Sequence, residues 1–237
     1  MQCIKTFQTL LILCFLPLAA CSTVDSTDIK TSGIDASITL NATGNNSTAV
    51  EVSLSSGSDG VRLIDGDTLV ATSGASSKTL SGADGFYDTT FGTDAGAVYT
   101  IELRRPNDPN ASSSVSLPAP FTITAPAANQ LFPSGSNVNV QWSPAMNSVL
   151  IYAYTTSCTD TAGGSVQKSN SISVVGINGG YTIATANLLP SGIDPNITCV
   201  CNVNLIHQVQ GTISPNLKSG STITAAQLRN ISFLINP

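Results

Sequence analysis

The sequence has few of the residues from which nucleic-acid and catalytic sites are built. Of its 237 residues, 10% are charged and 5% are aromatic, and it contains one tryptophan and one histidine. So few rings argue against a stacking platform for single-stranded nucleic acid. The net charge of -5 argues against a basic nucleic-acid surface. We therefore expect no nucleic-acid partner.

Catalytic signatures are missing as well. His207 is the sole histidine, so a serine triad would have to use it, yet no G-x-S-x-G elbow occurs in the chain. A polar residue near the end of a strand is ordinary, and we interpret His207 as structural. The sequence predicts a protein that is not an enzyme and that needs no cofactor.

Long apolar runs are limited to residues 10–18, which are too few to cross a bilayer, since a spanning helix takes about 20 residues. Lys5 precedes this run and Leu18-Ala19-Ala20-Cys21 ends it, in the order of a secretory signal peptide. The four residues resemble the lipobox of bacterial lipoproteins. The resemblance implies that residues 1–20 are cleaved off and that Cys21 carries lipid, palmitate included. Ordinary secretion with a free Cys21 thiol is the alternative.

The same resemblance bears on location. Cys21 would hold the mature chain on a membrane of the cell envelope, because two or more acyl chains give stable anchoring. Ser22 stands where the inner-membrane retention signal has aspartate. The family pattern therefore implies the outer membrane in preference to the inner membrane.

Serine, threonine, asparagine and glycine supply the polarity that charged residues do not, and these residues favour strands and turns over helix interiors. Residues 34–42 alternate apolar and polar side chains, as a half-buried strand does, and residues 50–54 repeat the pattern. Short runs of this kind recur between turn residues along the chain. They predict an all-β protein made of antiparallel sandwiches.

Two tandem domains are expected. Leu117-Pro118-Ala119-Pro120 marks the boundary, because prolines two apart do not fit a central strand. Residues 21–33 are interpreted as a polar tether, residues 34–118 as the first sandwich and residues 119–237 as the second, closed by runs at 222–229 and 231–235. Residues 21–118 hold twelve acids and five cations, a net charge of -7.

The second half carries a loose family resemblance. Gly135, Val138, Val140 and Trp142 form a G-x-x-V-x-V-x-W pattern, and Leu188-Leu189-Pro190 precedes a later strand. These motifs resemble fibronectin type III and related immunoglobulin-like domains. The resemblance implies an immunoglobulin-like sandwich, although the tyrosine that the family has after the second motif is absent here.

Three cysteines remain after Cys21: Cys158, Cys199 and Cys201. In an oxidising compartment we expect Cys158 to form a disulfide with one of the other two. Cys201 is the first choice because it lies deeper in its strand, and Cys199 is the alternative. A Cys-x-Cys pair lacks the further ligands of a zinc site, so no metal is assigned to it.

Three functions are compatible with this inventory. The leading hypothesis is a non-catalytic envelope lipoprotein that binds an unknown protein or glycan. An accessory carbohydrate-binding module would be favoured by a solvent-facing ring pair, either Tyr152 with Tyr154 or Phe86 with Tyr87. A calcium-dependent adhesin-like module would use Asp65 and Asp67, which are weak candidates because their spacing does not match a D-x-D-x-D-G loop.

Overall fold

The computed structural model describes residues 22–92 and 96–237. The predicted signal peptide and the lipidation candidate Cys21 lie outside this part of the chain. Strands account for 61% and helices for 6%, so the all-β prediction is confirmed. Within the described ranges, no helix has the length and hydrophobicity needed to cross a bilayer.

The first half of the chain forms short strands joined by tight turns. The predicted alternation is observed in residues 34–42: the buried apolar residues Ile34, Ala36, Ile38, Leu40 and Ala42 alternate with polar ones. The strands are β1 (Thr23–Asp25), β2 (Asp35–Ala42), β3 (Ser47–Ser56), β4 (Asp59–Arg62), β5 (Thr68–Ser73), β6 (Ser76–Thr79), β7 (Ser81–Ala83), β8 (Phe86–Gly92), β9 (Val98–Arg104) and β10 (Ala111–Ser116), with 3₁₀ turns at Ser26–Asp28 and Thr31–Gly33.

The second half contains longer strands and one short helix. Val138, Val140 and Trp142 are buried on one side of their strand, as the alternating pattern predicts. The elements are β11 (Thr122–Ala125), β12 (Leu131–Pro133), β13 (Asn137–Ser143), β14 (Val149–Thr159), β15 (Ser165–Val175), a 3₁₀ turn (Gly176–Asn178), β16 (Gly180–Ala184), α1 (Thr185–Leu188), β17 (Cys199–Gln210) and β18 (Thr222–Asn236).

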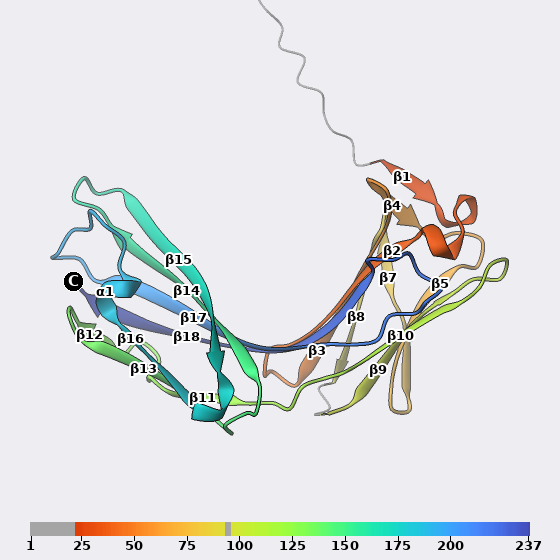
Figure 1. The fold of residues 1–237 in the computed structure, drawn as a ribbon. Coiled ribbons are helices and arrows are strands. Elements are labelled where there is room, and N and C mark those ends of the chain that lie inside the picture. Colours follow the sequence, from red (N-terminus) through yellow and green to blue (C-terminus); the bar gives the residue numbers. More distant parts are fainter. Residues whose placement is uncertain (1–21, 93–95) are drawn as a thin grey trace, which may run out of the picture.

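These strands build an arc (Figure 1). One large sheet runs through both halves in the order β1-β4-β3-β2-β18-β17-β14-β15, with β7, β8 and β12 beside this path. A second sheet, β10-β9-β5-β6, packs against one end, and a third, β11-β13-β16, packs against the other. The large sheet lines the concave side of the arc, and each smaller sheet encloses a hydrophobic core on the convex side.

Strand β18 belongs to both halves. Residues 224–235 pair antiparallel with β17, while residues 222–227 pair in parallel with β2. Ile223 and Ala225 are buried in the first core, and Phe233 and Ile235 are buried in the second. The predicted boundary therefore needs correction, because part of residues 119–237 completes the first module. A strand of 15 residues is long enough to reach across both cores.

The predicted tether is also folded. Strand β1 pairs in parallel with β4, and Ser26 and Thr31 are buried. Arg105 holds this segment in place: its guanidinium donates to the carbonyl oxygens of Ser26 and Ile29, the latter at 2.9 Å. The segment looks like a linker in the sequence because side chains that hold it, such as Arg105 and Asp108, lie more than 70 positions away.

Polar side chains join the two modules along β17 and β18. Gln227 is fully buried and donates to the carbonyl oxygen of Pro118 at 3.0 Å. Arg229 donates to the carbonyl oxygens of Phe121 at 2.7 Å and Ala42 at 3.2 Å. Since Phe121 follows the predicted boundary and Ala42 ends β2, Arg229 ties the second module to the first.

Candidate functional site

His207 lies on β17 at the junction between the two modules, beside Gln227. It is buried directly across from Gln227, and its ring hydrogen-bonds the backbone of Ala119. Burial lowers the pKa of His207 below its ordinary value, which favours the neutral ring. His207 thus helps to hold the linker against the sheet.

The disulfide joins Cys158 to Cys199, so the first choice of Cys201 is wrong and the alternative is correct. The register of β14 and β17 gives the reason. Thr156 lies opposite Cys201 and Ser157 lies opposite Val200, which brings Cys199 opposite Cys158 at the end of the ladder. All three cysteines face the core, so burial alone did not distinguish them. Cys201 is a buried free thiol.

The calcium candidates lie in the turn between β4 and β5. Asp67 is buried and its carboxylate accepts a hydrogen bond from Arg105 Nε at 2.9 Å, while Asp65 is exposed. Within the described ranges, no three histidine, cysteine, aspartate or glutamate side chains are close enough to share a metal ion. The Asp67 carboxylate is therefore already paired with the buried guanidinium of Arg105.

Neither of the two aromatic pairs that would mark a glycan platform has both of its rings exposed. Tyr152, Tyr154 and Tyr87 are buried, whereas the Phe86 side chain is 72% exposed. Tyr152 and Tyr154 pack in the second core with a centroid distance of 6.4 Å. A sugar would thus meet one ring at Phe86 and no second ring beside it.

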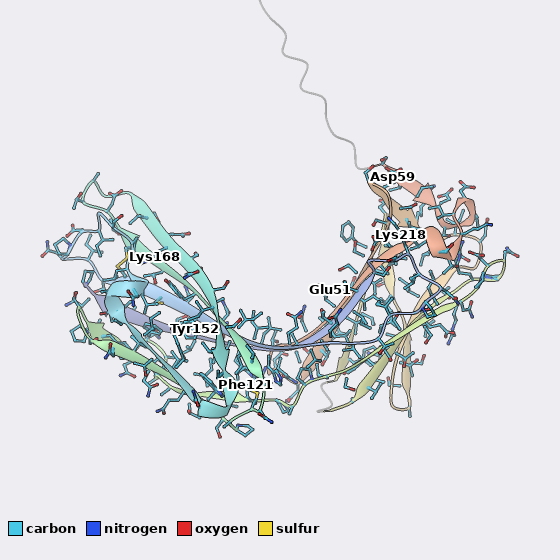
Figure 2. The ribbon with its side chains drawn as sticks, viewed as in Figure 1. Glu51, Asp59, Phe121, Tyr152, Lys168 and Lys218 are labelled. Atoms are coloured by element: carbon cyan, nitrogen blue, oxygen red, sulfur yellow. A yellow bond between two sulfur atoms is a disulfide. The ribbon has the colours of Figure 1, made fainter. Side chains whose placement is uncertain are left out.

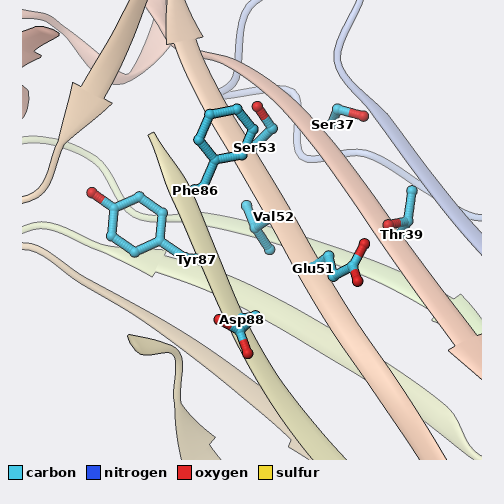
Figure 3. Close-up of a pocket in the computed structure, with 8 residues that line it drawn as sticks. All are labelled: Ser37, Thr39, Glu51, Val52, Ser53, Phe86, Tyr87 and Asp88. Carbon is cyan, nitrogen blue, oxygen red and sulfur yellow. The ribbon is translucent and has the colours of Figure 1, made fainter. Parts of the chain in front are cut away.

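Phe86 stands over a shallow groove on the concave face of the large sheet (Figures 2 and 3). The groove has a volume of about 370 Å³ and is formed by β2, β3 and β8. Cross-strand pairing arranges the side chains that line it in two rows. One row is Ser37, Ser53 and Phe86; the other is Thr39, Glu51 and Asp88.

The second row places two carboxylates side by side. Glu51 on β3 lies directly opposite Asp88 on β8, and both side chains are exposed. The ion pairs among the described residues use other acids, so neither carboxylate has a cation within 4.0 Å. Like charges directly opposite one another on neighbouring strands destabilise a sheet. A positively charged group bound over the pair would relieve this repulsion.

Sequence reasoning did not find this groove. Glu51 and Asp88 are 37 positions apart, and nothing in the local pattern of either strand shows that β3 pairs with β8. The alternation did place Glu51 on the polar face of its strand. The sequence also named Phe86 as a possible surface ring, although in a pair with Tyr87, which the structure buries.

No family model and no curated protein matches the chain. Among solved structures, it is similar to the Yersinia pseudotuberculosis adhesin InvE, with 12% identity and a TM-score of 0.25 over 85% of this chain and 60% of that one. It is also similar to the calcium binding domain CBD12 of CALX1.1, with 10% identity and a TM-score of 0.24 over 84% and 99%. A third match is to fibronectin(III)-like modules of Clostridium thermocellum CbhA, with 10% identity and a TM-score of 0.21 over 82% and 91%.

The chain spans less than two thirds of the adhesin chain that it matches. TM-scores of this size assign neither a ligand nor an activity.

Proposed function

We propose that the protein is a lipid-anchored, non-catalytic binding protein of the cell envelope, placed on the outer membrane by Cys21 and Ser22. The observation that carries the binding role is the groove at Phe86, where an exposed ring stands beside the carboxylates of Glu51 and Asp88. These side chains project from a sheet backed by a hydrophobic core, so the surface is rigid before it binds.

The groove fits an extended peptide segment that carries a positive charge next to an apolar side chain. Phe86 and Asp88 are two positions apart on β8, and side chains two apart on an extended ligand have the same spacing, about 7 Å. A lysine or arginine of the ligand would pair with the carboxylates while its neighbour covers Phe86. The net charge of -7 on residues 21–118 attracts such a ligand over longer distances.

Removing the two carboxylates should weaken this binding. We expect Glu51→Gln with Asp88→Asn to lower the affinity for a synthetic peptide that has phenylalanine and lysine two residues apart by about tenfold, because each ion pair contributes up to about 1 kcal/mol. Fluorescence anisotropy measures the affinity. Salt should weaken binding to the parent protein and have less effect on the variant.

The matched control is Asp28→Asn with Asp65→Asn, which removes the same charge from exposed positions outside the groove. A peptide with glutamate in place of lysine is the control ligand. Equal affinity of the groove variant and the control variant would show that the groove is not the binding site. Phe86→Ala tests the apolar half separately.

Anchoring is tested by Cys21→Ala. We expect this variant to move from the membrane pellet to the soluble periplasmic fraction, because the acceptor of the acyl chains is gone. Fractionation followed by immunoblotting measures the distribution, with Cys201→Ala as the control that keeps the lipobox intact. Sedimentation of the Cys21→Ala protein with membranes would contradict the anchor.

A further inference from the structure

Strand β15 leaves a long edge of the large sheet open. It is the last strand on the sheet's path, and within the described part of the chain it pairs only with β14, over all eleven of its residues. The opposite edge of the path ends in β1, which has three residues. Natural sheets usually shorten or cover their edges, because an open edge presents unpaired N–H and C=O groups to other chains.

The sequence of β15 lacks the features that normally prevent edge pairing. It contains no proline or glycine, and its register with β14 is unbroken, so there is no bulge to bend it away. Its one charged residue, Lys168, does not project freely from the edge. The Lys168 ammonium donates to the carbonyl oxygen of Leu189 at 3.1 Å.

We infer that β15 pairs with β15 of a second copy of this chain, antiparallel and centred on Asn170. This arrangement sets Lys168 opposite Ile172 and Val166 opposite Val174 on the face toward the core. A parallel arrangement in register would place the two Lys168 residues opposite one another, which is unfavourable. Strand β15 contains no aspartate or glutamate. It therefore has no negative charge that would make a basic strand of another protein a better partner than β15 of a second copy.

The concave face supports the same partner. Across the two-fold axis, Ser169 lies opposite Ser171 of the partner subunit, so polar side chains continue from one copy to the next. Within one copy, the Thr155 hydroxyl on β14 and the Ser169 hydroxyl on β15 lie side by side on this face, 2.9 Å apart. A two-fold axis perpendicular to the sheet keeps both concave faces on the same side. Both grooves of the dimer would then open in one direction.

The test compares the oligomeric state of two lysine variants by sedimentation velocity over a range of concentrations, using the detergent-solubilised protein. We expect the parent to be dimeric. Ser169→Lys with Ser171→Lys places two pairs of like charges across the axis and should weaken the dimer by about tenfold. Asn202→Lys with Asn204→Lys is the control, because these exposed residues lie on the same face but on the interior strand β17.

The register has its own test. Asn170→Cys should give a disulfide-linked dimer on oxidation, because among the antiparallel registers this residue meets itself only in the proposed one; Asn202→Cys should not. A monomeric parent at all concentrations would overturn the inference. So would a dimer that both lysine variants weaken equally, or a failure of Asn170→Cys to cross-link. None of these outcomes depends on whether the groove binds a peptide.

Discussion

Arg105→Met is expected to destabilise the first module by about 3–5 kcal/mol, because it leaves a buried carboxylate without its cation. The Arg105 side chain is 4% exposed and that of Asp67 is 5% exposed, with 2.9 Å between Nε and Oδ2. The same guanidinium bonds Asp108 at 3.0 Å and the carbonyl oxygens of Ser26 and Ile29. Urea denaturation measures the loss of stability.

Limited proteolysis distinguishes the loss of this one contact from a general loss of stability in the first module. Without Arg105, residues 22–33 lose the group that fixes them, so limited proteolysis should cut there before it cuts elsewhere. Arg104→Met is the control, since Arg104 is half exposed and pairs with Glu102 at the surface. Its cost should stay below about 1 kcal/mol. Equal stability of the two variants would contradict the role assigned to Arg105.

Replacing both Cys158 and Cys199 with serine is expected to lower the free energy of unfolding by about 4 kcal/mol. The disulfide closes a loop with a sequence separation of 41, and the chain-entropy model assigns a cross-link of that size this value. The loss should fall on the second module, whose core contains both residues. Thermal or urea denaturation of the variant against the parent measures it.

Cys201→Ala is the matched control, and we expect it to cost about 1 kcal/mol because it removes one buried atom and leaves the cross-link in place. Burial raises the pKa of the Cys201 thiol to about 11, so the thiol should react with maleimide only after unfolding. If Cys201→Ala were as destabilising as the double variant, the cross-link would have to involve Cys201.

The sequence predicted those parts of the fold that depend on local pattern. Alternation located β2, β3 and β13 and identified which of their residues are buried, because side chains on a strand point to opposite faces in turn. These predictions need no knowledge of which strands are neighbours.

The features that sequence reasoning missed all depend on pairing between distant segments. The choice between Cys199 and Cys201 required the register of β14 against β17. The ordering of residues 22–33 required Arg105, more than 70 positions away. The groove required the pairing of Glu51 with Asp88. Register of this kind is set by how the whole sheet assembles, and it leaves no mark in either strand alone.

The sharing of β18 has a mechanical consequence. Residues 222–227 of β18 pair with β2 and residues 224–235 pair with β17, so a pull that draws the two ends of the arc apart loads these ladders along the strand direction. Many hydrogen bonds must then break together. The two modules would resist traction as one body, as the proposed lipid anchor would require if a bound partner pulled on the chain.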